Sequence, residues 1–136
     1  MARVTHVHET VLYARDLDAM RRFYREIVGL LQVSDARPRG MAFRVDERSV
    51  VLVFDAGLTR EAHRDVPSHG MEGEGHVAFG VEGGLEEWRK RLEGAGLRIE
   101  REMTWPTGAR SVYVRDPAGN SVEFVEGDVW AREPLK

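Results

Sequence analysis

The chain has 136 residues, of which 42% are hydrophobic and 32% charged, a composition typical of one globular domain with a single substantial core. The formal net charge of -3 gives no basic surface, which argues against nucleic acid or an anionic membrane as a partner. The absence of cysteine excludes disulfides, thiolate metal sites and cysteine nucleophiles. Since no apolar run reaches the length of a signal peptide or a membrane span, we expect a cytoplasmic protein.

The first half of the chain has the pattern of a strand, a helix and three strands. Residues 4–14 alternate in polarity as a strand does, and they place Glu9 on an otherwise apolar face. The next segment can be capped by Asp16 or Asp18, has apolar residues at helical spacing, and is expected to end at Gly29. Three further strands are predicted at residues 30–35, 41–45 and 49–54.

A connector is predicted between the two halves. Residues 55–74 contain several glycines and charges as well as His63 and His69. The sequence predicts one helical turn near residues 59–63. Histidines in loops are mostly exposed to solvent, so these two carry no assigned role, although a connector of this length can lie over a pocket.

The second half repeats the order of the first. Residues 75–81 form a predicted strand with His76, Ala78 and Gly80 on one face, where the two small residues leave space beside the imidazole. The other face of this strand is apolar and is expected to join the core. The helix expected next spans residues 85–93, and three strands follow at residues 97–103, 109–114 and 121–125.

This repetition predicts an α+β fold in which two βαβββ modules form a curved sheet around a shared cavity, with the helices outside. Laying the second half on the first places His76 on Glu9, and Glu123 on Val51. The expected boundaries are residues 1–57 for the first module, 58–74 for the connector, 75–126 for the second module and 127–136 for the tail.

Glu9, His76 and Glu123 are the candidate metal ligands. They occupy positions that a duplicated fold would direct into one cavity. An imidazole and two carboxylates suit Mn²⁺, Fe²⁺, Ni²⁺, Co²⁺ or Zn²⁺. Each carboxylate taken alone could equally be a surface residue or one member of an ion pair.

Four stretches carry a resemblance to a known family: residues 9–17 (ETVLYARDL), 23–30 (FYREIVGL), 75–79 (GHVAF) and 116–123 (DPAGNSVE). Together they resemble the vicinal oxygen chelate superfamily, which includes glyoxalase I, extradiol dioxygenases, fosfomycin-resistance thioltransferases and bleomycin-resistance binders. The resemblance implies that Glu9, His76 and Glu123 hold a divalent metal ion. It also implies a homodimer, because members of this family usually pair modules within or between chains.

The chain departs from the family pattern at two positions. The ligand of the first strand is commonly histidine or glutamine, whereas this chain has Glu9. Val51 stands where glyoxalase I has a fourth ligand that also serves as its base. A glyoxalase I reaction would therefore need Glu9 or Glu123 to act as the catalytic base.

Two functions follow as hypotheses. The first is a glyoxalase-like or dioxygenase-like metalloenzyme, a lyase, isomerase or dioxygenase that chelates adjacent oxygens of a small-molecule substrate at the metal. The second is a metal-free small-molecule binding protein of the bleomycin-resistance kind. Candidate residues for the cavity wall are Tyr13, Arg44, Trp105, Arg110 and Tyr113.

Overall fold

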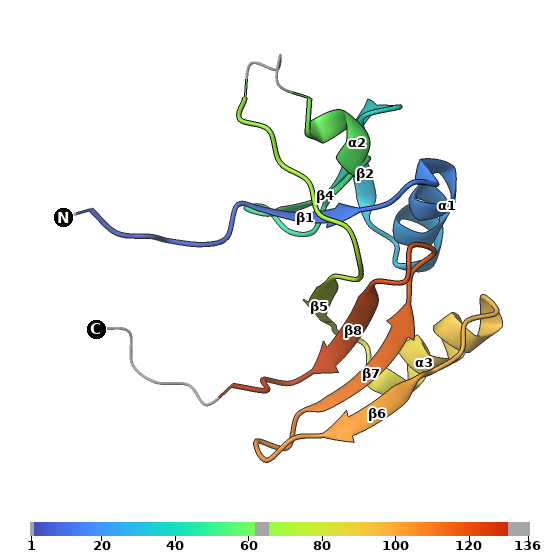
Figure 1. Cartoon of the computed structure of the whole chain (residues 1–136). Coiled ribbons are helices and arrows are strands. Elements are labelled where there is room, and N and C mark those ends of the chain that lie inside the picture. The colour runs from blue at the N-terminus through green and yellow to red at the C-terminus, as the bar shows by residue number, and fades with distance from the viewer. Residues whose placement is uncertain (1, 62–65, 131–136) are drawn as a thin grey trace. The chain divides into compact units, whose positions relative to one another are not determined.

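A computed structural model gives the fold and describes residues 2–61 and 66–130. The chain divides into two compact units, Met1–Gly75 and His76–Lys136. Each unit contains a strand, a helix and three strands in that order, which confirms the α+β fold and the repeat that the sequence predicted (Figure 1). Among the described residues, no helix combines the length and the apolar character needed to span a membrane.

The first unit is built on a four-stranded sheet with the order β1-β4-β3-β2. The pair β1 and β4 is parallel, and the other pairs are antiparallel. The helix begins at Leu17 because the Asp16 carboxylate accepts a hydrogen bond from the Ala19 amide at 3.0 Å. The elements are β1 (Glu9–Tyr13), α1 (Leu17–Arg21), the π-helical continuation η1 (Arg22–Ile27), β2 (Leu31–Ala36), β3 (Gly40–Arg44), β4 (Val50–Phe54) and α2 (Ala56–Thr59).

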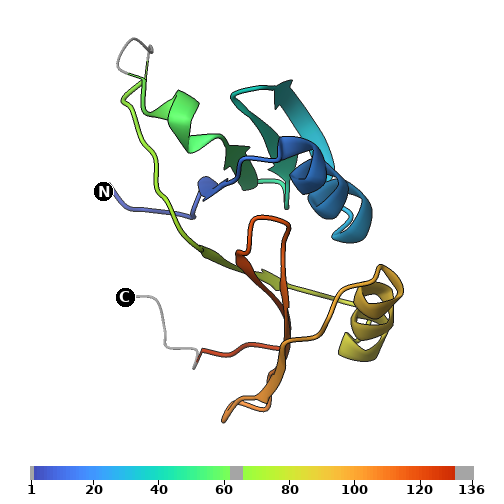
Figure 2. The same cartoon turned by 45° about the vertical axis from the view of Figure 1, so that its right-hand side comes forward.

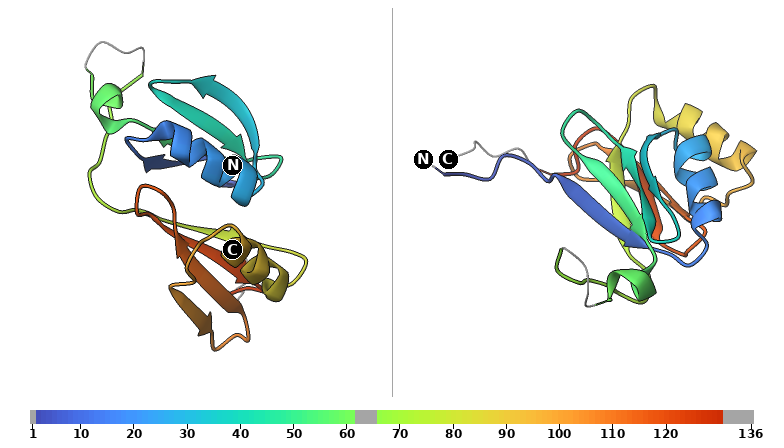
Figure 3. Two further views of the ribbon diagram at one scale, coloured as in Figure 1. Left: turned by 90° about the vertical axis from the view of Figure 1, so that its right-hand side faces the viewer. Right: turned by 90° about the horizontal axis from the view of Figure 1, so that it is seen from above.

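The core of the first unit lies between α1 and one face of this sheet (Figure 3). Tyr24 and Phe43 are fully buried there, with ring centroids 5.9 Å apart. Val51 and Val53 of β4 are buried on the same side, while Leu52 between them is only half-buried. The sheet therefore has a core face toward α1 and a second face, which we call the face opposite α1.

The second unit repeats this plan with the strand order β5-β8-β7-β6 and a parallel β5–β8 pair. Its helix α3 packs on one face of the sheet (Figure 2). Phe124 is fully buried in this core and stacks on Trp88 of the helix at a centroid distance of 4.8 Å. The elements are β5 (His76–Gly80), α3 (Leu85–Gly94), β6 (Arg101–Thr104), β7 (Arg110–Arg115) and β8 (Ser121–Glu126).

Three elements differ from the expected ranges by more than one residue. The first strand begins at Glu9 instead of residue 4, because β4 offers five partners only, from Val50 to Phe54. The strand expected from residue 97 begins at Arg101, where pairing with β7 starts. The helical turn of the connector occurs earlier, as α2, because Asp55 caps it by accepting from the Gly57 amide at 2.9 Å; residues 62 and 63 of the expected turn, including His63, lie outside the described residues.

Candidate metal centre

The face opposite α3 carries the polar residues of the second sheet. Val122 and Phe124 of β8 point into the core and are fully buried, so Glu123 between them points to the other side. Strand pairing sets Ala78 and Tyr113 directly beside Glu123. His76 lies two residues before Ala78 on the same face, as the alternation of the sequence predicted.

His76 and Glu123 are in direct contact. Nε2 of His76 lies 3.2 Å from Oε1 of Glu123, and Nδ1 lies 3.0 Å from the backbone carbonyl oxygen of Ser121. Because a carbonyl can only accept, Nδ1 must carry the proton, and in the neutral ring Nε2 presents a lone pair to the carboxylate. Two acceptors that face each other require a cation between them, either a proton on Nε2 or a metal ion.

A first-row divalent ion fits this arrangement. Bonds of about 2.1 Å to an imidazole nitrogen and a carboxylate oxygen place the two atoms about 3.0 Å apart in octahedral and about 3.4 Å apart in tetrahedral coordination. The observed separation of 3.2 Å lies between these values. A histidine whose second nitrogen donates to a backbone carbonyl is also the usual form of a metal ligand.

The second oxygen of Glu123 is held inside the protein. Oε2 accepts a hydrogen bond of 2.6 Å from the Ser111 hydroxyl, and Ser111 Oγ accepts one of 2.9 Å from the indole nitrogen of Trp105. Ser111 is fully buried and Glu123 is 5% exposed. The carboxylate therefore has one oxygen bound within the unit and one oxygen facing His76.

Tyr113 completes the group on this face. Its ring is nearly parallel to the His76 imidazole, with a centroid distance of 6.3 Å. Burial raises the pKa of the Tyr113 phenol above its ordinary value, and the negative charge of Glu123 and a hydrogen bond to that carboxylate raise the pKa further. The phenol is therefore protonated at neutral pH and can donate a hydrogen bond.

The first unit places Glu9 at the position equivalent to His76. Glu9 begins β1 and pairs with Val50, just as His76 begins β5 and pairs with Ser121. The Glu9 side chain is exposed on the face opposite α1. Within each unit, the described residues form no group of three or more histidines, aspartates or glutamates with metal-ligand spacing, so Glu9 as the third ligand stays a prediction.

The predicted equivalence of Val51 and Glu123 is wrong by one residue. Leu52 pairs with Val11 and Ala42, and Glu123 pairs with Ala78 and Tyr113 at the same places of the second sheet. Leu52 is thus the equivalent of Glu123, while Val51 belongs to the core. Leucine binds no metal either, so the first unit still offers no ligand at this position.

Arg44 and Arg110 are two of the residues that the sequence predicted to line the cavity. Arg44 ends β3 and pairs with Val50, which places it on the face opposite α1. Arg110 lies on the α3 side of its sheet, where its guanidinium is 3.2 Å from the Glu86 carboxylate of α3. Arg110 therefore lies on the face of the sheet away from Glu123.

Tyr13, also predicted to line the cavity, contacts the connector. Its hydroxyl lies 2.6 Å from Nδ1 of His69, and the His69 ring lies 5.4 Å from that of Phe54. The sequence alone did not identify this contact, because a loop residue has no periodicity that reveals its partner.

Ser111 is a second residue of the site that the sequence analysis did not name. It shares a strand face with Tyr113, so alternation along β7 could have indicated it.

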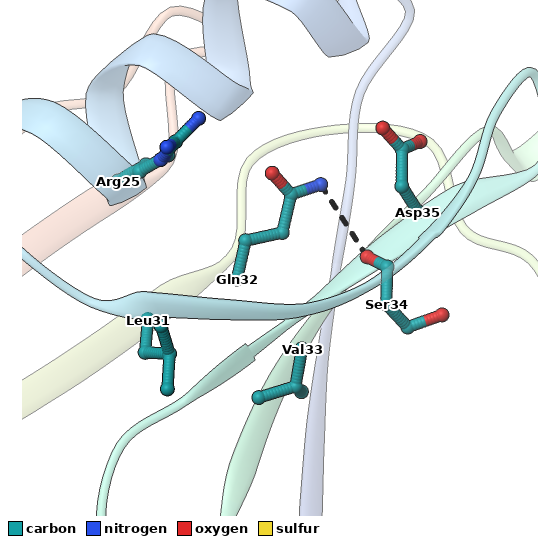
Figure 4. Close-up of a pocket in the computed structure, with 6 residues that line it drawn as sticks. All are labelled: Arg25, Leu31, Gln32, Val33, Ser34 and Asp35. Carbon is teal, nitrogen blue, oxygen red and sulfur yellow. Dashed lines mark hydrogen bonds between the residues drawn. The ribbon is translucent and has the colours of Figure 1, made fainter.

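A shallow pocket lies along β2, at the edge of the first sheet (Figure 4). Leu31 and Val33 point to one side of the strand, and Gln32 points to the other. The pocket lining contains one carboxylate, that of Asp35, which forms an ion pair with Arg37 at 2.8 Å. The lining offers no pair of metal ligands and no nucleophile beside a base, so we assign no chemistry to this pocket.

The comparisons with known proteins agree with this architecture. Residues 6–124 match the model of the Glyoxalase/Bleomycin resistance protein/Dioxygenase superfamily. No curated protein sequence matches the chain. A solved structure titled lactoylglutathione lyase, from Agrobacterium tumefaciens, is 39% identical with a TM-score of 0.88, and the match covers 96% of this chain and 100% of that one.

More distant structures share the fold alone. A glyoxalase/bleomycin resistance protein/dioxygenase from Nocardioides is 22% identical with a TM-score of 0.71, covering 100% of this chain and 92% of that one. A virulence protein from Salmonella typhimurium is 21% identical with a TM-score of 0.73, covering 93% of this chain and 100% of that one.

Proposed function

Because the chain belongs to the Glyoxalase/Bleomycin resistance protein/Dioxygenase superfamily, we propose that it is a metal-dependent enzyme that acts on a small molecule with adjacent oxygen atoms. The observation that carries the proposal is the contact between His76 and Glu123, two acceptors 3.2 Å apart that need a cation between them. We propose Glu9 as the third ligand, which would leave open positions for substrate oxygens. We further propose that the enzyme works in the cytoplasm.

The proposed chemistry divides between the ion and the side chains. A divalent ion held by His76, Glu123 and Glu9 would supply Lewis-acid stabilisation of negative charge on a substrate oxygen. Tyr113, whose phenol donates to the Glu123 carboxylate, would line the substrate cavity beside the ion. Tyr13 and Arg44 lie on the face opposite α1 and are proposed to contact other parts of the substrate.

Within this class, lactoylglutathione formation is the reaction to test first, since a protein 39% identical to this chain carries that name. A glyoxalase I reaction of this kind isomerises a thiohemiacetal to a thioester by moving a carbon-bound proton to the neighbouring carbon. A side chain must accept that proton and return it. Both oxygens of Glu123 have partners, so the exposed Glu9 is the better candidate for the base.

Metal analysis tests the proposal directly. Protein purified without chelator is expected to contain about one divalent ion per chain, and His76→Ala and Glu123→Ala are each expected to lose it, because each removes a donor atom. His6→Ala is the matched control, since His6 is an exposed histidine outside the strands; this variant should keep the metal. The measurement is elemental analysis by mass spectrometry, with the Tm recorded before and after EDTA.

The alternative function predicts the opposite result. A metal-free binder would contain no ion, and EDTA would leave its Tm unchanged. Leu52, which cannot bind a metal at the position equivalent to Glu123, is the observation that favours this alternative. In that case His76 and Glu123 would form an ion pair with the proton on Nε2.

A further inference from the structure

Only one carboxylate oxygen of Glu123 faces His76. The other oxygen is held by a hydrogen bond from Ser111. An isolated carboxylate has two equivalent oxygens and can bind a metal through one or both. In this chain Oε2 is occupied by Ser111 at 2.6 Å, and Oε1 faces His76. Ser111 of the neighbouring strand β7 therefore determines which oxygen of Glu123 is left to face His76, before any metal binds.

The direction of the hydrogen bonds follows from their chemistry. An indole N–H can only donate, so Ser111 Oγ must accept from Trp105. The Ser111 hydroxyl proton is then directed to Glu123, since the carboxylate can only accept. The three groups form a one-way chain of donors that ends at Oε2.

Trp105 is itself fixed by the turn between β6 and β7. Its amide donates to the Ala109 carbonyl at 2.8 Å, and its carbonyl accepts from the Gly108 amide at 2.9 Å. Gly108 has a φ of +86°, a conformation that other residues rarely adopt. The indole is thus attached to a hydrogen-bonded turn, which makes it suitable for holding Ser111 in one orientation.

The first unit has no such chain. Ser111 pairs with Val125 in the second sheet, and Gly40 pairs with Phe54 at the same place of the first sheet. Gly40 is therefore the equivalent of Ser111. A side chain at Gly40 would collide with the Phe54 ring at 2.1 Å. The arrangement of Trp105 and Ser111 is therefore not a general requirement of the βαβββ fold, and it occurs in the unit that contains His76 and Glu123.

We propose that Ser111 and Trp105 are positioning residues that hold Glu123 as a one-oxygen metal ligand, with Trp105 acting through Ser111. This inference rests on the proposed function, because it concerns the ligand of the same metal. Neither residue touches the metal or the substrate in this scheme. Their effect is to fix the carboxylate so that Oε1 needs no reorientation when the ion binds.

The test is the affinity for Zn²⁺ alone, measured by competition with a chelator in the full chain. Ser111→Ala is expected to weaken Zn²⁺ binding by about 10-fold to 100-fold, and Ser111→Thr, which keeps the hydroxyl, should restore most of the affinity. Trp105→Phe should have a smaller effect. Thr59→Ala is the control for the loss of a buried hydroxyl, since Thr59 is fully buried in the other unit; its Zn²⁺ affinity should equal that of the wild type.

A double-mutant cycle separates positioning from general damage. Because Trp105 acts through Ser111, the variant that combines Trp105→Phe with Ser111→Ala should bind Zn²⁺ no more weakly than Ser111→Ala alone. Additive losses, or a Ser111→Ala variant with wild-type affinity, would overturn the inference. If that wild-type affinity still depends on His76, the proposed function stands while the inference fails.

A second measurement needs no metal. The indole N–H of Trp105 gives its own signal in a ¹H–¹⁵N spectrum, assigned with Trp105→Phe. In metal-free protein, Glu123→Ala should shift this signal, because the hydrogen bond from Trp105 to Ser111 is polarised by the next bond to Glu123. An unchanged signal would overturn the inference. A wild type that binds no Zn²⁺ but shows the shift would contradict the proposed function and support the positioning of Glu123.

Discussion

At the scale of single residues, the parallel pairing of β5 and β8 brings His76 beside Glu123 and the Ser121 carbonyl. His76 and Glu123 could be predicted because each is a polar residue whose strand neighbours are apolar, so its side chain must leave the core. The Ser121 carbonyl that fixes the His76 tautomer could not be predicted, because it is a backbone atom brought close by parallel pairing of β5 and β8. A contact between distant parts of the sequence has no local signature.

Substitutions of Glu9 test its proposed roles as a metal ligand and as the catalytic base. Glu9→Gln keeps an oxygen donor for the metal but cannot accept a proton, so we expect the metal content to remain and kcat for lactoylglutathione formation to fall by about 10²-fold to 10⁴-fold. Glu9→Ala removes both properties and should also weaken metal binding. The measurement is the steady-state rate of thioester formation together with the metal content of each variant. A Glu9→Gln enzyme with wild-type kcat would assign the base to another residue.

At the scale of elements, the sequence predicted the order of strands and helices well and the register less well. The segment from Val50 to Val53 is apolar throughout, so alternation could not tell which of its residues face the core. The match of Val51 with Glu123 came from this ambiguity, and only the pairing of β4 with β1 and β3 corrects it to Leu52. Helix ends were better predicted, because glycines mark them chemically.

The end of α3 offers a prediction with its own control. Gly96 has a φ of +83° and no atom within 4 Å of an added Cβ, so Gly96→Ala meets no collision and costs only the backbone strain, about 1–2 kcal/mol. Gly94 is the last residue of α3 and also has open space around it, without a positive φ. Gly94→Ala should stabilise the protein by up to about 1 kcal/mol, because alanine favours the helix.

Denaturant unfolding of the two variants measures this difference. We expect the two alanines, two positions apart, to change the free energy of unfolding in opposite directions. Equal effects would mean that the conformation of Gly96 does not govern the end of the helix.

At the scale of the whole molecule, the two units carry the same plan with different side chains. The second unit has His76, Ser111, Tyr113 and Glu123 on the face opposite α3, whereas three of the equivalent positions in the first unit are Gly40, Ala42 and Leu52. The fold repeats, but the polar network does not. The repeat therefore allowed the architecture to be predicted. The polar residues of the second unit could be recognised only from their own positions in the sequence.

The oligomeric state is the prediction at this scale. We propose a homodimer, supported by exposed apolar side chains on β2, where Leu31 is 68% and Val33 46% exposed. Light scattering coupled to size-exclusion chromatography should give twice the chain mass of 15.4 kDa. A single species at the mass of one chain, over a tenfold range of protein concentration, would contradict the proposal.

The hydrogen bond from His76 Nδ1 to the Ser121 carbonyl has a consequence for sequence variation. Every amino acid carries the same backbone oxygen, so no substitution of the side chain at position 121 deletes the group that orients the imidazole. The imidazole can thus keep its proton on Nδ1 whichever side chain stands at position 121. Tolerance at position 121 and intolerance at position 76 would be the expected outcome of a saturation screen for metal retention.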